Sequence, residues 1–283
     1  MTLLQAAVFG LIQGLTEFLP ISSAAHLRIV SALMGWNDPG TAFTAVIQLA
    51  IVVTLLLYFW NELIQIAVAM LRGAQTGRLF ESQNARLGWM IVVGTLPIIV
   101  LGLAFKKHVE TSLRSLYVIA FAEIGLALAL IVAEWLERSR IAGGTRLREI
   151  KDVTWGDTIL VGLAQCLALI PGASRSGSTI TGGLFVGFTR ETAARFSFLL
   201  ALPSFLGAGV LEFLHHRHEL LAAPGAGRNL VVATVVAILV GYAAVAFLMN
   251  YLKRHTTWIF IIYRLILGAV LLALLANGRL QAF

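Results

Sequence analysis

The chain has 283 residues, of which 59% are hydrophobic and 12% charged, and its mean hydropathy is +0.88. Because a soluble domain carries roughly 25% charged residues, this composition excludes an ordinary soluble protein and predicts an all-α polytopic integral membrane protein. The net charge of +7 comes from basic residues in short loops between apolar runs. That distribution is typical of membrane topology, so we expect no nucleic-acid partner.

The apolar runs predict eight helices, of which about six are long enough to cross a membrane. A crossing needs about 20 residues. The two others, 3–19 and 156–170, each lead to a proline and then to a short segment rich in Ser, Thr and Gly. We interpret these pairs as re-entrant helical hairpins over 3–35 and 156–189, with return arms at 21–35 and 175–189. The six crossings are expected at 41–60, 87–104, 115–136, 192–214, 230–251 and 257–276.

Two stretches of the sequence are alike, namely "FGLIQGLTEFLPISSAAH" and "VGLAQCLALIPGASRSGS". Gln13 aligns with Gln165, an offset of 152 residues, with one residue of slippage before the proline. The likeness indicates an internal repeat, with copies at about 1–136 and 154–277 inside a single membrane domain, 1–283. Because a hairpin and three crossings reverse the side on which the chain emerges, the second copy starts on the opposite face. This predicts an inverted-topology repeat, whose site lies near the bilayer midplane.

Charge in the loops predicts the orientation. On this topology the face opposite the N-terminus carries eleven basic residues and the N-terminal face six, which favours the former as cytoplasmic and places both termini outside. No basic region precedes the first apolar run, so we expect a retained N-terminal segment rather than a signal peptide. The six basic residues of the N-terminal face are Lys106, Lys107, Arg114, Arg217, Arg228 and Arg279.

The segment "PGASRSGST", residues 171–179, has the composition of an anion site. The planar guanidinium of Arg175 suits two phosphate oxygens. Ser174, Ser176, Thr179 and the nearby glycines allow hydroxyl and backbone N–H groups to approach an anion, and a helix N-terminus here would add a favourable partial charge. The alternative is a solvated loop with an incidental arginine.

The segment "EFLPISSAAH", residues 17–26, gathers polar groups inside an apolar run. Gln13 and Glu17 are four residues apart and share a helix face. Ser23 and His26 follow the proline and would stack on one helical turn. Glu and His together are typical of acid–base chemistry and of metal binding. The alternative reading is structural: a serine caps the return helix, and His26 is a satisfied polar residue of the bundle.

Other polar residues give weaker signals. Glu123 lies within an apolar run without a motif partner, and either an interhelical hydrogen bond or a functional role would explain it. Gln48 is expected to join helices by hydrogen bonds, with lining of the site as the alternative. Snorkelling of side chains near span ends suffices for three others, and the histidines at 215–218 lack the carboxylates of a metal site. The three are Arg195, Glu212 and Arg264.

Two motifs together, "GLIQGLTEFLPISSAAH" and "IPGASRSGSTITGGLFVGFTRETAARFSFLLALP", resemble those of the bacitracin-resistance family of undecaprenyl-diphosphate phosphatases. The likeness extends over nearly the whole chain. It implies an enzyme of the bacterial plasma (inner) membrane that hydrolyses undecaprenyl diphosphate to undecaprenyl phosphate and phosphate. The product is the lipid carrier for peptidoglycan and other cell-wall polymers, and its recycling confers bacitracin resistance. The active site would open to the outer, periplasmic face.

The resemblance also implies the site residues. The family's acidic motif falls on Gln13 and Glu17, its serine and histidine on Ser23 and His26, and its phosphate motif on three further residues. Family members are usually stimulated by a divalent cation such as Mg²⁺ or Ca²⁺. The sequence departs from the pattern at Gln13, which weakens a two-carboxylate metal site, and in "SSAAHLR", where Arg28 adds a charge. The phosphate motif falls on Ser174, Arg175 and Thr179.

The resulting hypothesis is hydrolysis of a polyprenyl diphosphate, with Arg175 holding the phosphates. Ser23 or a water molecule attacks, and His26 acts as general base or acid, oriented by Glu17. Alternatively, Glu17 and Gln13 help to hold the metal ion. Two other functions remain open at this point: a polyprenyl-phosphate transporter or flippase on the same inverted repeat, and a non-catalytic lipid-binding scaffold. The expected partners are the lipid substrate and membrane lipids, with a homodimer as one of the open oligomeric states.

Overall fold

The computed structural model describes residues 1–283 except 111–112, 114, 223–224 and 282–283, and it leaves undescribed the side chains at 41, 106–110, 219 and 221. Of the basic residues counted on the N-terminal face, Arg114 and the side chains of Lys106 and Lys107 lie outside the described residues. All regular elements of the described chain are helices, with one isolated bridge between Arg148 and Phe188. They are α1 (Leu3–Phe18), α2 (Ser23–Met34), α3 (Gly40–Tyr58), α4 (Trp60–Thr76), α5 (Gln83–Glu110), α6 (Leu116–Ala142), η2 (Ile150–Asp152), α7 (Trp155–Gln165), η3 (Cys166–Leu169), α8 (Arg175–Phe185), α9 (Arg190–Ala222), α10 (Ala226–Leu252) and α11 (Trp258–Ala276).

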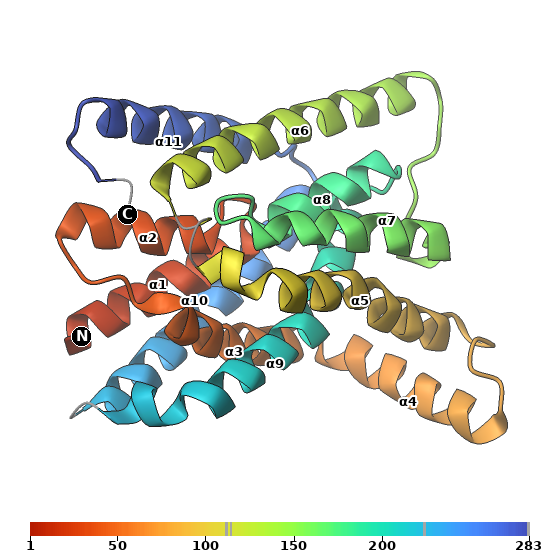
Figure 1. Cartoon of the computed structure of the whole chain (residues 1–283). Coiled ribbons are helices and arrows are strands. Elements are labelled where there is room, and N and C mark those ends of the chain that lie inside the picture. The colour runs from red at the N-terminus through yellow and green to blue at the C-terminus, as the bar shows by residue number, and fades with distance from the viewer. Residues whose placement is uncertain (111–112, 114, 223–224, 282–283) are drawn as a thin grey trace.

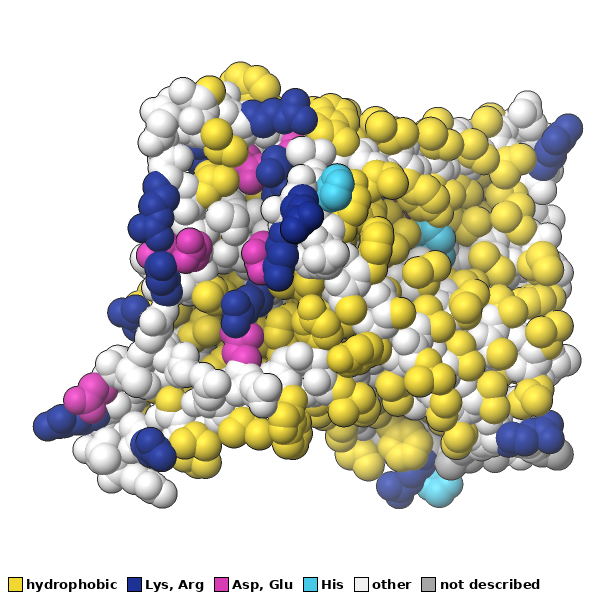
Figure 2. Space-filling view, turned by 180° about the vertical axis from the view of Figure 1, so that it is seen from behind, with side chains coloured by type: hydrophobic (Ala, Val, Ile, Leu, Met, Phe, Trp, Pro, Cys, Tyr) yellow, Lys and Arg dark blue, Asp and Glu magenta, His cyan; other side chains and the backbone are white. Residues whose placement is uncertain are grey.

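Five helices of the described chain are long and apolar enough to cross a membrane, namely α5, α6, α9, α10 and α11, and the bent pair α3–α4 makes a sixth if it is one span. This confirms the all-helical prediction with five to six candidate spans. The two helices of the pair meet at 86°. The structure also adds α4, which the sequence analysis did not predict. A broad hydrophobic band covers the middle of the molecule, and charged side chains gather at one end (Figure 2).

Two pairs of helices, α1–α2 and α7–α8, turn back inside the molecule, and their turns, at 19–22 and 166–174 and called the breaks below, meet near its centre (Figure 1). Figure 1 shows α1 and α2 reaching inward from the side where α1 begins, and α7 and α8 reaching inward from the opposite side. Both pairs start with a capping box, built on Thr2 and Gln5 before α1 and on Thr154 and Asp157 before α7. The two caps are related by the same offset, 152 residues, as Gln13 and Gln165. The likeness of the two sequence stretches therefore extends to the side-chain caps at the start of α1 and α7.

Close contact of backbones holds the first arm of each broken pair. A Cβ atom on Gly10 of α1 would lie 2.3 Å from the carbonyl oxygen of Ala233 in α10, and one on Gly162 of α7 would lie 2.4 Å from that of Gly94 in α5. Small residues permit such close packing where there is no water to drive helices together. Each arm thus packs on a helix from the other half of the chain, so that the two halves interlock.

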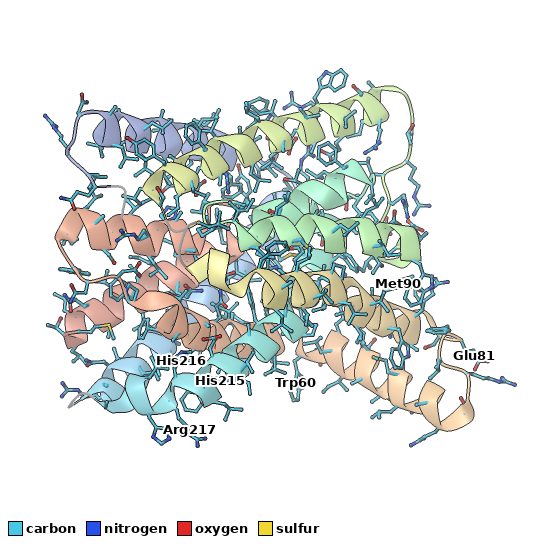
Figure 3. The ribbon with its side chains drawn as sticks, in the orientation of Figure 1. Trp60, Glu81, Met90, His215, His216 and Arg217 are labelled. Atoms are coloured by element: carbon cyan, nitrogen blue, oxygen red, sulfur yellow. The ribbon has the colours of Figure 1, made fainter. Side chains whose placement is uncertain are left out.

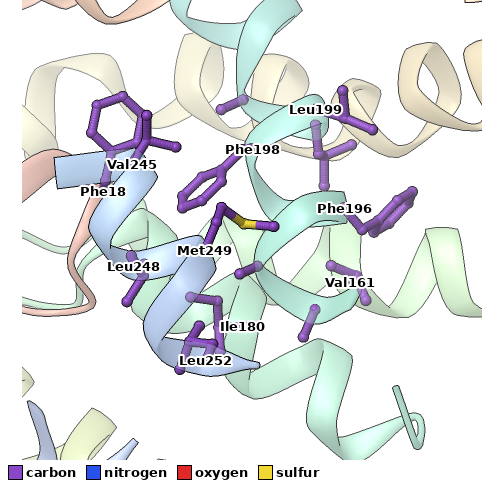
Figure 4. Packing of buried hydrophobic residues seen from close by; sticks show 14 of the residues in the cluster. Phe18, Val161, Ile180, Phe196, Phe198, Leu199, Val245, Leu248, Met249 and Leu252 are labelled. Carbon is purple, nitrogen blue, oxygen red and sulfur yellow. The ribbon is translucent and has the colours of Figure 1, made fainter. Parts of the chain in front are cut away.

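The main hydrophobic core lies behind the two breaks. It joins Phe18, at the end of α1, to α8, α9 and α10 (Figure 4). The rings of Phe18 and Phe198 meet edge to face with centroids 5.4 Å apart. Edge-to-face aromatic pairs add stability beyond their buried area. This packing fixes the end of α1, and therefore Glu17, relative to α8 and α9.

The histidines of α9 lie far from the loop that joins α4 to α5 and form no metal site with other described residues. Glu81, between α4 and α5, lies at the end opposite to His215, His216 and Arg217 of α9 (Figure 3). The Nδ1 atom of His215 bonds within its own helix, 2.8 Å from the carbonyl oxygen of Leu211. Among the described residues no group of three or more His, Cys, Asp or Glu side chains has the arrangement of a metal site.

Candidate active site

The two breaks create two helix N-termini that face the same region. Ser22 caps α2 with φ 68° and ψ 101°, and Ser174 caps α8 with φ 64° and ψ 119°. A positive φ is unfavourable for residues with a side chain, and such strain concentrates at functional sites. Each turn places the next residue, Ser23 or Arg175, at the start of its helix. The chain therefore brings a hydroxyl and a guanidinium together from opposite sides.

The Glu17 carboxylate lies between these groups. Its Oε2 atom accepts hydrogen bonds from the Ser23 hydroxyl at 2.5 Å and from Gln13 Nε2 at 2.8 Å. Its Oε1 atom lies 3.7 Å from Arg175 Nε, and both side chains of this ion pair are 5% exposed. A buried carboxylate beside a cation, with a hydroxyl donating to it, is an arrangement that can accept a proton from that hydroxyl. The structure thus brings together Gln13, Glu17, Ser23 and Arg175.

One guanidinium nitrogen of Arg175 is hydrogen-bonded to the protein, and the other two have no hydrogen-bond partner in the described structure. Its Nη1 atom donates to the carbonyl oxygen of Ser197 at 3.0 Å and to the hydroxyl of Ser197 at 3.3 Å. The guanidinium carbon lies 4.7 Å from the centre of the Phe205 ring. The Nε and Nη2 atoms are buried and have no hydrogen-bond partner in the described structure. Unsatisfied buried donors are costly, so these two N–H groups are suited to an anion that is brought by a ligand.

The other predicted phosphate-binding residues differ in placement. Ser174 lines the cavity beside Arg175 and accepts the Gly177 N–H at 3.1 Å. Ser176 instead donates to the carbonyl oxygens of Glu17 and Leu19, at 3.1 and 3.0 Å, so it ties one break to the other.

Thr179 also uses its hydroxyl inside the protein. It donates to the carbonyl oxygen of Arg175 at 2.8 Å and pairs with the Ser197 hydroxyl at 2.6 Å. Its position is one turn behind the cavity, where it supports Arg175 through Ser197. Sequence reasoning missed Ser197, whose only signal is a hydroxyl within the apolar run of α9.

His26 lies on another side of α2. Its Nδ1 atom is 2.7 Å from the carbonyl oxygen of Ser22, and its Nε2 atom is 2.5 Å from the hydroxyl of Tyr263. The two rings stack with centroids 5.6 Å apart. Because a carbonyl only accepts, Nδ1 carries the proton in the neutral ring and Nε2 accepts from Tyr263. His26 is not among the residues that line the cavity, and Tyr263 was not anticipated from the sequence.

A cavity of about 550 Å³ opens from the meeting point of the breaks. Its volume is in the range of small-molecule sites, roughly 300–1,000 Å³. Glu17, Ser23 and Arg175 lie on its wall, and most of the remaining lining is apolar. Gln48 also lines it, which was the alternative considered for this residue. The apolar lining comes mainly from α3, α5, η3 and α9, and includes Ala45, Ile98, Ile99, Leu103, Leu169, Phe205 and Leu211.

Arg28, which follows "SSAAH" in the sequence, lines the same cavity. It faces Asp38, with Nε and Oδ2 3.8 Å apart. Asp38 lies just before α3, near the side of the molecule where α1 begins.

Arg264 requires a correction. The sequence analysis placed it near a span end, where its side chain could snorkel to water, but it is 0% exposed and forms an ion pair with Glu123 at 3.1 Å. Glu123 thereby has the partner that the sequence did not reveal. The two residues lie on different helices, α11 and α6, and no spacing rule along one helix relates them.

A divalent cation would find oxygen donors at this site. Glu17 provides a carboxylate, and the Oε1 atom of the neighbouring Gln13 is buried without a hydrogen-bond partner in the described structure. Mg²⁺ is commonly held by one or two carboxylates together with substrate phosphates. The donor set therefore fits a cation that takes most of its remaining ligands from a phosphorylated substrate.

Comparison with known proteins gives a consistent result over the whole chain. Residues 6–270 match the family described as bacitracin resistance protein BacA. The chain is 56% identical over 283 residues to the undecaprenyl-diphosphatase of Chloroherpeton thalassium, covering 100% of both chains. It is 54% identical over 282 residues to that of Chlorobium phaeobacteroides strain BS1, covering 100% of both. It is 55% identical over 280 residues to that of Chlorobaculum tepidum, covering 99% of both.

Proposed function

The chain belongs to the BacA family of bacitracin resistance proteins and is a bacterial multi-pass membrane undecaprenyl-diphosphatase, and we propose that Glu17, Ser23 and Arg175 carry its reaction. The observation that supports this most strongly is the geometry around Glu17. A hydroxyl donates to the carboxylate at 2.5 Å, and the Arg175 guanidinium lies beside it, with Nε 3.7 Å from Oε1 and with two N–H groups that have no hydrogen-bond partner in the described structure. Phosphoryl transfer depends mainly on positioning and charge stabilisation, and these groups supply both.

The substrate would lie with its diphosphate at the breaks and its isoprenoid tail along the apolar lining of the cavity. The free N–H groups of Arg175 would bind phosphate oxygens, with the N-terminus of α8 adding a favourable partial charge. As the bond between the terminal phosphorus and the bridging oxygen breaks, negative charge increases on the leaving undecaprenyl phosphate. Donors that are already fixed in place stabilise such charge without reorganisation.

The attacking group would be the Ser23 oxygen, activated by transfer of its proton to Glu17. The attack would form a phosphoserine and release undecaprenyl phosphate, and water would then hydrolyse the phosphoserine to free phosphate. The alternative is a water molecule, activated by Glu17, that attacks the terminal phosphorus directly. Both routes use Glu17 as the base and consume one water molecule.

His26 would act by position rather than by proton exchange with Ser23. Its ring bonds the Ser22 carbonyl and the Tyr263 hydroxyl, which supports a role in holding the strained turn before Ser23. This proposal differs from the general base or acid that the sequence suggested for His26. The reason is that both ring nitrogens already have hydrogen-bond partners and that His26 is not among the residues that line the cavity.

A divalent cation, Mg²⁺ or Ca²⁺, would be held by Glu17 and the free amide oxygen of Gln13 together with the diphosphate. When bound, it would neutralise phosphate charge in addition to Arg175. The protein's own residues would keep their tasks: Glu17 accepts the proton, and Arg175 binds and orients the phosphates.

The architecture proposed for this chemistry is a pair of re-entrant hairpins in an inverted-topology repeat. The equal spacing of the two capping boxes and of Ser22 and Ser174 supports the repeat. The cavity includes Asp38 and Glu212, near the side where α1 begins. The loop charges favour this side as the outside, so we propose an inner-membrane protein whose site opens to the periplasm.

Phosphate release from a polyprenyl diphosphate by the purified protein tests the proposal. Wild type should be active and sensitive to EDTA, while Glu17→Gln should lose about 10²-fold or more in kcat, because a proton acceptor contributes about 10²–10⁴-fold. Glu62→Gln, on α4 and paired with Arg195, is the matched control and should retain wild-type activity. Full activity of Glu17→Gln would overturn the assigned site. The transporter alternative rests on architecture alone and predicts no phosphate release.

A further inference from the structure

Arg264 has no exposed surface and no place in the proposed chemistry, yet it makes more contacts with backbone oxygens than any other side chain described above. Its Nη1 atom donates to the carbonyl oxygen of Pro20 at 3.0 Å. Its Nη2 atom donates to that of Gly172 at 2.8 Å, with a longer contact of 3.5 Å to Ala173. Pro20 belongs to the first break and Gly172 to the second.

The same guanidinium also reaches α6. Nε lies 3.2 Å from the carbonyl oxygen of Glu123, and Nη2 lies 3.3 Å from that of Ala122. One planar group therefore links both breaks and one neighbouring helix. Only arginine has several donors in a rigid fork that can reach such separated acceptors at once.

The carboxylate of Glu123 compensates the positive charge of the buried Arg264 side chain. It lies 3.1 Å from Nε of Arg264, and both side chains are 0% exposed. The two carboxylate oxygens accept no hydrogen bond from the described residues. The carboxylate thus balances the charge of Arg264 and leaves its N–H groups to the backbone carbonyls. An unpaired charge at this depth would be strongly destabilising.

We infer that Arg264 is a positioning residue for the hydrolysis, because it fixes the Ser23 turn relative to the Arg175 turn. This inference rests on the proposed function. Pro20 precedes Ser23 by three residues, and Gly172 precedes Arg175 by three. A shift of one turn against the other changes the distance between the attacking oxygen and the bound phosphate. Misplacement of about 1 Å costs on the order of 10² in rate.

The two breaks are also joined directly, by hydrogen bonds of Ser176. Because these bonds remain when Arg264 is substituted, the effect of Arg264 can be measured separately. Ser176 donates to the carbonyl oxygens of Glu17 and Leu19, before the turn at Pro20. Arg264 binds the turn itself, at the carbonyl oxygen of Pro20. With the Ser176 contact intact, loss of Arg264 should loosen the turns without separating the two halves.

The test is Arg264→Lys in the full-length protein. Lysine keeps the charge opposite Glu123 but offers one nitrogen, which cannot reach Pro20 and Gly172 together. We expect kcat to fall by about 10-fold or more while KM stays within about threefold, since the groups that bind substrate are unchanged. Amide hydrogen exchange should increase at 19–23 and 172–175 and stay unchanged at the α3–α4 junction. A merely structural role would lower the thermal midpoint without this selective pattern.

The matched control is Arg195→Lys, in an ion pair with Glu62 at 2.8 Å that touches neither break. It should keep wild-type kcat and exchange. If Arg264→Lys does not fold, Glu123→Gln gives a second test. It preserves the carbonyl contacts, so the thermal midpoint should fall while kcat per folded molecule stays within about threefold of wild type.

Two results would overturn the inference: wild-type kcat and exchange in Arg264→Lys, or a loss of kcat in Glu123→Gln as large as in Arg264→Lys. Arg175→Ala separates this failure from failure of the proposed function. If Arg175→Ala is inactive and Arg264→Lys is fully active, the site stands and only the positioning role is lost. If Arg175→Ala is fully active, the proposed site itself is wrong.

Discussion

Ser22 and Ser174 adopt nearly the same backbone conformation, with φ/ψ of 68°/101° and 64°/119°. They are the only residues other than glycine with positive φ in the described chain. Each caps a helix that starts with a residue of the proposed site, Ser23 or Arg175. One turn geometry, used twice, therefore brings the Ser23 hydroxyl and the Arg175 guanidinium to the two oxygens of Glu17.

The strained turn at Ser22 predicts that glycine preserves thermal stability at this position better than alanine does. Glycine adopts positive φ without a steric penalty, whereas a left-handed conformation costs other residues roughly 1–2 kcal/mol. The capping bond from Ala25 is long, at 3.4 Å, so little is lost with the hydroxyl. Thermal unfolding should therefore rank Ser22→Gly at or above wild type and Ser22→Ala below Ser22→Gly. Equal midpoints for the two variants would argue against strain at this turn.

Substitution of Ser23 distinguishes the two attacking groups. If the Ser23 oxygen attacks, Ser23→Ala should lose 10³-fold or more in kcat, on the order of the effect of removing a covalent nucleophile. Mass spectrometry of acid-quenched wild type should then show a phosphate on the peptide that contains Ser23. Substantial activity in Ser23→Ala together with an unmodified wild-type peptide would assign the attack to water. Ser31→Ala serves as the control, because Ser31 lies eight residues further along the same helix, α2, and its hydroxyl donates to the carbonyl oxygen of Leu27.

Arg175→Lys should lose phosphatase activity although it preserves the positive charge. Arg175 uses Nη1 for Ser197, keeps Nε and Nη2 without a hydrogen-bond partner in the described structure, and lines the cavity. Lysine cannot do both, because it has a single nitrogen. Since loss of one fixed donor to a developing charge costs about 10²–10³ in kcat, we expect a decrease of that size in phosphate release. A lysine variant with wild-type kcat would show that point charge alone suffices.

Substitution of Gly172, which lies next to the Arg264 contacts, should destabilise the protein. Its φ is +97°, and a Cβ atom there would lie 2.6 Å from the carbonyl oxygen of Ile119. Gly172→Ala should lower stability by at least about 1 kcal/mol through backbone strain, with a further penalty from the overlap with α6. Gly125→Ala is the matched control, because a Cβ there has no neighbour within 4 Å. Similar midpoints for the two variants would contradict the close approach of the second break to α6.

Much of the local structure could be predicted from the order of residues along the chain. Apolar length predicted the candidate spans, because a helix must cover the hydrocarbon thickness. Proline followed by serine predicted where α1 ends and α2 begins, since proline cannot continue a helix and serine caps one. Gln13 and Glu17 were predicted to share a helix face, and their hydrogen bond at 2.8 Å confirms it. These are relations within a few residues, which helical periodicity fixes.

Which distant groups meet depends instead on how the helices pack in three dimensions. This packing gave His26 the hydroxyl of Tyr263 as a partner, it turned the hydroxyl of Thr179 toward Ser197, and it buried Arg264 against Glu123. The last pair joins residues of α11 and α6 that are far apart in the chain. Contacts of this kind depend on how helices pack and on the close backbone approaches that Gly10 and Gly162 allow. The spacing of residues along one helix carries no information about them, and the burial of a charge becomes visible only when its partner is in place.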